Sequence, residues 1–153
     1  MKLNKNKDPK TAMDDRLKNL DSSNLFDNAK LVKELSPKDF DPNKVWQLKS
    51  KKCTLVIFYC AWCGHCKAAV DVWTKLANYA AFVDFAAFNC QKHNGHIRKI
   101  KNDMPQMVTS YPTIIGYVKG DPVETFEGDR NFDNLLKFAQ RICRSSVGSI
   151  LRG

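Results

Sequence analysis

Hydrophobic side chains follow two different spacings in the middle of the chain. Residues 54–59, Thr-Leu-Val-Ile-Phe-Tyr, form a run that is apolar after its first residue. Such a run is typical of a central strand that is covered on both faces of a sheet. Directly after it, apolar residues recur at three- and four-residue spacing, at Cys66, Ala69, Val70, Trp73, Leu76, Ala77 and Ala80. This spacing predicts a helix of about four turns that begins at Cys63 and buries one face.

Similar patterns predict the other elements on either side of this strand and helix. We expect strands at 31–35, 54–59, 83–88, 113–118 and 123–126. We expect helices at 43–48, from 63 to about 80, at 93–101 and from 132 onward, the last with Asn131 as its N-cap. The turn residues Lys119-Gly120-Asp121-Pro122 join the last two strands as a hairpin. The predicted order is therefore β-α-β-α-β-α-β-β-α, which indicates an α/β domain.

Length and composition bound the organisation of the chain. With 153 residues, of which 43% are hydrophobic, it can bury one sizeable core. We expect a polar, partly disordered N-terminal extension over residues 1–30, one domain over 31–144 and a short tail over 145–153. No apolar run approaches the roughly 20 residues that span a bilayer. Because neither a secretory signal nor an ER-retention sequence is visible, we expect a cytoplasmic protein that does not enter a membrane.

The net charge of +9 allows more than one interpretation. A solvated lysine surface explains it most simply, while an acidic partner or a nucleic acid would use clustered cations. Two such clusters are present, one made of Lys49, Lys51 and Lys52 and the other of Lys92, Arg98, Lys99 and Lys101. No recognised nucleic-acid motif accompanies them, so nucleic acid is the less favoured partner.

The segment Trp62-Cys63-Gly64-His65-Cys66 carries the most specific chemistry of the sequence. Two cysteines separated by two residues at the start of a helix can form a disulfide, and the helix N-terminus stabilises a thiolate on the first. Cys63 is the expected nucleophile, and Cys66 is the expected resolving thiol that displaces the substrate from a mixed disulfide. A cationic His65 would favour the thiolate further and make the pair more oxidising. Ordinary solvent exposure is the alternative for His65.

A metal site is the main competing interpretation of these cysteines, because half of a zinc site has the same spacing. Cys60, Cys63, His65 and Cys66 would supply four ligands, but a second cysteine pair is missing and the strand-to-helix geometry would have to break. We therefore expect no metal and no cofactor besides the redox-active disulfide itself.

The remaining cysteines and histidines are interpreted as structural. Free cysteine is a good small core residue, and we assign Cys53, Cys60, Cys90 and Cys143 to that role. Cys60 lies near the dithiol in sequence, so it is also a candidate to react with it. For His93 and His96 we expect solvent exposure.

Three separated segments resemble one known family. Residues 58–67 (Phe-Tyr-Cys-Ala-Trp-Cys-Gly-His-Cys-Lys), 110–113 (Ser-Tyr-Pro-Thr) and 126–130 (Phe-Glu-Gly-Asp-Arg) are similar to the domains of protein disulfide isomerases, within the thioredoxin superfamily. The resemblance covers roughly residues 31–144. It implies a thioredoxin fold with a mixed five-stranded sheet flanked by helices, and a cis peptide bond before Pro112 beside the dithiol.

The same resemblance implies roles for individual residues. Trp62, Gly64, Tyr111 and Pro112 would form the surface that meets the substrate, with the backbone of Tyr111 pairing with substrate peptide. Arg130 matches an arginine thought to swing toward the resolving cysteine, here Cys66, and lower its pKa, with a solvated loop arginine as the alternative.

The chain departs from the family pattern at Ile57, six positions before Cys63, where the family usually has a buried Glu or Asp. That carboxylate is thought to exchange a proton with the resolving thiol. Because isoleucine cannot do so, we expect slower turnover than in a complete family member.

Together these features predict a thiol–disulfide oxidoreductase of the oxidase or isomerase type that acts on protein thiols and disulfides. Its redox partner would be glutathione or a sulfhydryl oxidase or reductase. The alternatives are a thioredoxin-like cytosolic reductase and a redox-weak binding or chaperone-like module. An oxidising motif in a cytosolic chain is a contradiction, since cytosolic dithiols are kept reduced. A large DNA virus with its own disulfide-forming pathway would resolve it and would suit the Lys- and Asn-rich composition.

Overall fold

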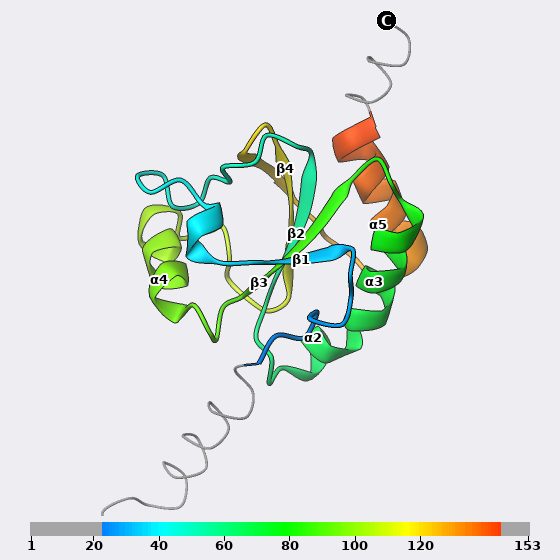
Figure 1. The fold of residues 1–153 in the computed structure, drawn as a ribbon, viewed down its shortest axis with the longest axis horizontal. Coiled ribbons are helices and arrows are strands. Elements are labelled where there is room, and N and C mark those ends of the chain that lie inside the picture. The colour runs from blue at the N-terminus through cyan, green and yellow to red at the C-terminus, as the bar shows by residue number, and fades with distance from the viewer. Residues whose placement is uncertain (1–22, 145–153) are drawn as a thin grey trace, which may run out of the picture.

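The computed structural model of the protein describes residues 23–144 as a central sheet covered by helices on both faces (Figure 1). The sheet has five strands in the order β1-β3-β2-β4-β5. The strands are β1 Val32–Leu35, β2 Thr54–Tyr59, β3 Asp84–Asn89, β4 Thr113–Val118 and β5 Asp121–Thr125. β1, β3 and β2 run parallel, while β4 is antiparallel to β2 and β5 is antiparallel to β4. The predicted mixed five-stranded sheet is confirmed.

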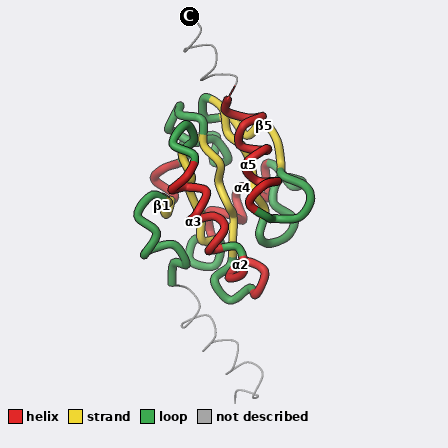
Figure 2. Tube along the Cα trace, turned by 90° about the vertical axis from the view of Figure 1, so that its right-hand side faces the viewer, coloured by secondary structure: helices red, strands yellow, loops and turns green. Residues whose placement is uncertain are grey.

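Side chains alternate along the strands and so divide the core into two layers. The helices are α2 Gly64–Ala68, α3 Val70–Tyr79, α4 Asn94–Asp103 and α5 Phe132–Ala139, with a 3₁₀ turn at Pro37–Asp39 and a π-helical turn at Gln140–Arg144. α3 and α5 cover one face, where Leu55, Ile57 and Tyr59 of β2 meet Trp73 and Phe138. α4 covers the other face. Figure 2 shows α2 at one end of the molecule and β5 near the other.

Two helix predictions differ from the structure. The predicted helix from Cys63 is divided at Ala69, whose N–H donates to the Cys66 carbonyl at 3.1 Å in a tightened turn. The predicted helix at 43–48 is wrong, because this segment is a loop. The Asp41 carboxylate accepts the N–H groups of Asn43 and Lys44 at 2.8 Å each, which makes a side-chain-stabilised turn that competes with a helix.

His93 and His96 are half-buried, so their predicted exposure is wrong. The His93 ring stacks on Phe88 and the His96 ring lies 4.7 Å from that of Phe40, between centroids. His96 Nε2 also lies 2.9 Å from the carbonyl oxygen of Val45. Burial lowers the pKa of both imidazoles. They therefore help to hold α4 and the loop before β2 onto the sheet.

The predicted N-terminal extension is partly visible. Phe26 is 1% exposed and packs in the core beside Tyr59, so residues 23–30 are attached to the domain. Glu34 of β1 holds this segment, because its Oε2 accepts the Phe26 N–H at 3.1 Å and the Tyr59 hydroxyl at 2.5 Å. Residues 1–22 of the extension and the predicted tail over 145–153 lie outside the described residues.

The attachment through Glu34 predicts a pH-dependent stability. Burial raises the pKa of Glu34 from 4.5 to about 7, and its Oε1 is buried without a hydrogen-bond partner among the described residues. A raised pKa means that folding favours the neutral acid, so this contribution is complete below pH 4.5 and is lost as the pH rises through 7. Glutamine cannot ionise at this position. We therefore expect the free energy of unfolding of Glu34→Gln, relative to that of wild type, to rise by about 2–3 kcal/mol between pH 5 and 8.

Urea denaturation at several pH values measures this difference. Glu127→Gln, which makes the same change at an exposed position, is the control. A difference between Glu34→Gln and wild type that stays constant with pH would contradict the assignment.

Candidate active site

The two cysteines of the Cys-Gly-His-Cys segment lie where β2 ends and α2 begins, and their environments differ. Cys63 is the N-cap of α2 and is half-buried, whereas Cys66 is completely buried. Burial, with the neighbouring Cys63 as a smaller cause, raises the pKa of the Cys66 thiol to about 12. Cys63 is thus the thiol that a substrate can reach, and Cys66 is held one turn behind it. Both are free thiols in the structure.

The loop before β4 faces this dithiol. The peptide bond between Tyr111 and Pro112 is cis, and Pro112 is buried. The Cys63 thiol lies 3.8 Å from the Tyr111 carbonyl oxygen and donates a hydrogen bond to it. The Lys101 ammonium lies 5.3 Å from the centre of the Tyr111 ring, so a cation stands close to this loop. The structure therefore brings Cys63, Tyr111 and Pro112 together, although they are far apart in sequence.

The other residues around Cys63 form an open surface. Trp62 is 53% exposed, so it is not a buried structural residue, and its Nε1–H donates to Gln91 Oε1 at 2.9 Å. A Cβ atom on Gly64 would meet no heavy atom within 4 Å, so space next to Cys63 is free. His65 is exposed as well. Gln91, which orients the tryptophan, was missed by sequence reasoning because it lies after β3 and belongs to no motif.

Arg130 is exposed and lies in a groove of about 360 Å³ that Pro112 and Gly128 also line. No hydrogen bond or ion pair between Arg130 and Cys66 occurs in the described part of the chain. Its effect on the pKa of Cys66 stays a prediction. Ile57 is 0% exposed and packs in the same core cluster as Cys66, so the place of the family's acid is filled by an apolar side chain.

The cysteines outside the dithiol behave in two ways. Cys53 and Cys143 are joined by a disulfide, with Cα atoms 5.6 Å apart, so their assignment as free core cysteines is wrong. The cause is close packing of the C-terminal turn on the sheet, where Gly116 leaves room for the side chain of Ile142. Cys60 and Cys90 are free and buried, as expected.

A zinc site was the alternative interpretation of the Cys-Gly-His-Cys segment. Over residues 23–144, no group of three or more His, Cys, Asp or Glu side chains is arranged to hold a metal ion. A membrane-spanning helix is likewise not found in this part of the chain.

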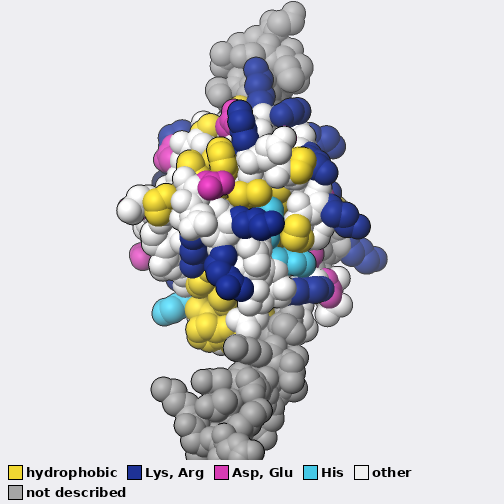
Figure 3. All heavy atoms as spheres, turned by 90° about the vertical axis from the view of Figure 1, so that its left-hand side faces the viewer, with side chains coloured by type: hydrophobic (Ala, Val, Ile, Leu, Met, Phe, Trp, Pro, Cys, Tyr) yellow, Lys and Arg dark blue, Asp and Glu magenta, His cyan; other side chains and the backbone are white. Residues whose placement is uncertain are grey.

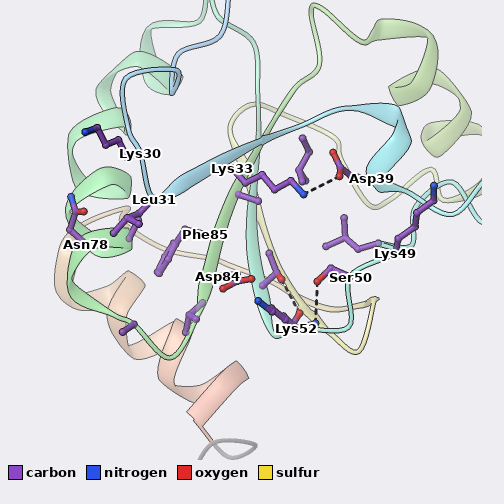
Figure 4. Close-up of a pocket in the computed structure, with 17 residues that line it drawn as sticks. Lys30, Leu31, Lys33, Asp39, Lys49, Ser50, Lys52, Asn78, Asp84 and Phe85 are labelled. Carbon is purple, nitrogen blue, oxygen red and sulfur yellow. Dashed lines mark hydrogen bonds and ion pairs between the residues drawn. The ribbon is translucent and has the colours of Figure 1, made fainter.

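A groove of about 930 Å³ lies away from the dithiol, where β2 and β3 begin (Figure 4). No cysteine lines it. Its lining combines lysines with acids, and Lys33 pairs with Asp39 at 3.1 Å. Lys49 and Lys52 of the first basic cluster also line it. Figure 3 shows Lys and Arg side chains spread over the face that carries α4, with few acids among them. The expectation of a solvated lysine surface, with nucleic acid as the less favoured partner, stays a prediction.

Comparisons with known proteins agree with this geometry. Residues 31–141 match the family model Thioredoxin. A rice protein named Protein disulfide isomerase-like 2-2 is 33% identical over 116 residues, which is 73% of this chain and 29% of the rice protein. The Arabidopsis thaliana Protein disulfide-isomerase 2-3 is 29% identical over 86% of this chain and 28% of its own length. The chain thus spans less than a third of these curated relatives.

Solved structures show the same fold. The J-Trx1 fragment of ERdj5 has a TM-score of 0.61 and 25% sequence identity, over 76% of this chain and 54% of the fragment. A thioredoxin from Malassezia sympodialis has a TM-score of 0.55 at 20% identity, over 72% of this chain and 90% of its own. These relatives come from plants and fungi where an organism is named, so a viral origin gains no support. The match over residues 31–141, together with the sheet order and the helices on both faces, shows that this chain belongs to the thioredoxin family.

Proposed function

We propose that the protein is a thiol–disulfide oxidoreductase of the oxidase or isomerase type, acting on protein substrates through Cys63 and Cys66. The observation that carries this proposal is the unequal burial of the two thiols at the end of β2. A half-buried nucleophile at a helix N-terminus can attack, while a buried thiol of high pKa reacts only with what is bound to its neighbour.

The exchange proceeds in two displacements. The Cys63 thiolate attacks one sulfur of a substrate disulfide, forms a mixed disulfide and releases the other substrate sulfur as a thiolate, which takes up a proton. Cys66 then loses its proton and attacks Cys63 Sγ, which releases the second substrate thiol and leaves the Cys63–Cys66 disulfide. Oxidation of a substrate dithiol is the same sequence in reverse. The electrons are carried by the two sulfur atoms, so the exchange itself requires no cofactor.

Several residues would guide a substrate to Cys63. Trp62 and Gly64 offer an exposed surface on one side, and the Tyr111 backbone lies on the other. The Tyr111 carbonyl, which accepts from the Cys63 thiol in the free protein, would become available to substrate peptide once Cys63 is in a mixed disulfide. Glutathione or a sulfhydryl oxidase or reductase would return the pair to its working form.

The Cys53–Cys143 disulfide bears on the direction of the reaction. Disulfides such as Cys53–Cys143 persist in oxidising compartments and are rare in the cytosol. This bond favours an oxidising compartment over the cytoplasm expected from the N-terminal sequence. It also favours an oxidase or isomerase over a cytosolic reductase.

The equilibrium reduction potential of the Cys63–Cys66 pair tests the proposal. It is titrated against glutathione and read by thiol alkylation and mass. A potential of about −180 mV supports an oxidase or isomerase, and one of about −270 mV supports a thioredoxin-like reductase. If the pair does not titrate as a two-electron couple, the enzymatic function fails and the binding module replaces it.

Ile57 makes a further prediction about turnover. With no carboxylate at this buried position, Cys66 must lose its proton to solvent before it can resolve the mixed disulfide. In Ile57→Glu we expect the mixed disulfide to be resolved faster, by a factor approaching ~100, which is the lower limit of what general base catalysis contributes. The buried acid should also reduce the free energy of unfolding. Stopped-flow decay of the mixed disulfide measures the rate. Ile57→Gln is the control, because glutamine has the shape of glutamate but no ionisable group. Equal rates in the two variants would contradict the explanation.

A further inference from the structure

Two buried cysteines outside the working pair lie directly after two neighbouring strands. Cys60 follows β2 and Cys90 follows β3. β2 and β3 are parallel with Tyr59 opposite Asn89, and the Cys90 N–H donates to the Tyr59 carbonyl at 2.8 Å. Cys60 directly follows Tyr59, and Cys90 directly follows Asn89. Neighbouring strands lie about 4.8 Å apart, and the Cα atoms of disulfides are usually about 4.4–6.8 Å apart. The backbone thus places the two cysteines at a spacing that a disulfide can span.

Both thiols belong to the layer that α4 covers, next to Cys63 of the working pair. Cys60 is 6% exposed, Cys90 is 3% exposed, and they lie in the same apolar cluster, against which Cys63 also packs. The Cys63 N–H donates to the Cys60 carbonyl at 3.1 Å. The Cys66 thiol is hydrogen-bonded to the Cys60 backbone. The Cys60 backbone therefore contacts both working cysteines, and the Cys60 side chain shares an apolar cluster with Cys90.

We propose that Cys60 and Cys90 form a second, buried dithiol that takes over the disulfide of Cys63 and Cys66. The proposal rests on the proposed function, which supplies the oxidised working pair. It differs from simple core packing in that the two thiols would exchange electrons with their neighbours.

The transfer balances without an external oxidant. The Cys60 thiolate attacks Cys66 Sγ, the Cys63–Cys66 bond breaks, and Cys63 leaves as a thiolate that takes the proton lost by Cys60. Cys90 then loses its proton and attacks Cys60 Sγ, which forms the Cys60–Cys90 bond and releases Cys66 to take that proton. One disulfide is reduced to two thiols while two thiols are oxidised to one disulfide.

Burial makes this transfer slow and keeps it internal. Removal from water raises the pKa of the Cys60 thiol to about 11. It also raises the pKa of the Cys90 thiol, although a hydrogen bond with Tyr111 acts in the opposite direction on Cys90. Few thiolates form at neutral pH, so substrates at Cys63 react first. Solvent glutathione does not reach either sulfur. When no substrate is present, the transfer returns Cys63 and Cys66 to the dithiol form, in which an isomerase attacks incorrect disulfides.

Peptide mapping of the wild-type protein tests the inference. The protein is equilibrated in glutathione buffers of increasing oxidised fraction, quenched with acid, alkylated and digested with trypsin. Cys60, Cys63 and Cys66 lie on tryptic peptide 53–67, which the Cys53–Cys143 disulfide already joins to the peptide of Cys143, and Cys90 lies on peptide 76–92. We expect all four thiols to become protected and the two peptides to become linked. Protection of Cys63 and Cys66 alone would overturn the second dithiol while leaving the proposed function intact, whereas protection of no thiol would overturn both.

Variants separate this pair from other pairings and from direct oxidation. In Cys60→Ala and in Cys90→Ala we expect two protected thiols and no link between the peptides, and a link that survives Cys60→Ala would overturn the pairing. In Cys63→Ala/Cys66→Ala we expect the link to form at least ~10-fold more slowly, because the internal route is removed. Formation at the wild-type rate would overturn the transfer step.

Discussion

Replacing Cys63 by serine is expected to reduce disulfide exchange by at least ~10³-fold. A serine hydroxyl forms no disulfide, so the remaining nucleophile would be Cys66. With a pKa of about 12, Cys66 has a thiolate fraction of only ~10⁻⁵ at pH 7, and its greater intrinsic nucleophilicity recovers ~10² of that loss. Its complete burial lowers the rate further. Initial rates with a fluorescent disulfide substrate, over a range of enzyme concentrations, measure the effect.

The companion substitution Cys66→Ser should fail at the other step. Cys63 still attacks, but nothing displaces the substrate, so a mixed disulfide accumulates that non-reducing electrophoresis detects and dithiothreitol releases. Cys63→Ser/Cys66→Ser should form no such complex. Accumulation of the complex in Cys63→Ser instead would reverse the two assigned roles.

The strands were predictable because hydrophobic spacing is a local property. The continuous run at 54–59 coincides with β2, and Thr113–Val118 was predicted without error. Asn131 was identified as the N-cap of α5, and its side-chain oxygen accepts the Asn134 N–H at 2.8 Å. In each case the residues that define the element are neighbours in sequence, so their pattern carries the information.

The predictions that were wrong depended on contacts between distant segments. The loop at 43–48 is an exception, because the Asp41 turn and an isolated bridge between Phe40 and Leu48 are local contacts that compete with a helix. The half-burial of His96 follows from Phe40 and Val45, about fifty positions earlier in the chain. The Trp62–Gln91 hydrogen bond joins two loops for the same reason. For the dithiol, the motif located Cys63 and Cys66, but the difference in their burial required the fold.

The Cys53–Cys143 disulfide is the clearest case of such a distant contact. Its cysteines are 90 residues apart, and spacing alone does not reveal which of six cysteines pair. The bond joins the start of β2 to the turn after α5 and so encloses the whole active-site segment and the cis-proline loop. A cross-link around a loop of this length removes much of the conformational freedom of the unfolded chain.

Breaking this bond is expected to lower the free energy of unfolding by roughly 4–5 kcal/mol, which corresponds to a fall in Tm of about 10–20 °C. Cys53→Ala, Cys143→Ala and the double variant should lose nearly the same amount, because each removes the same bond. Thermal and urea unfolding measure the loss, with Cys90→Ala as a control for the removal of a buried sulfur that is a free thiol in the structure. If the single losses add in the double variant, the two side chains act independently. That result would mean that the domain is held by packing alone, and it would also remove the argument for an oxidising compartment.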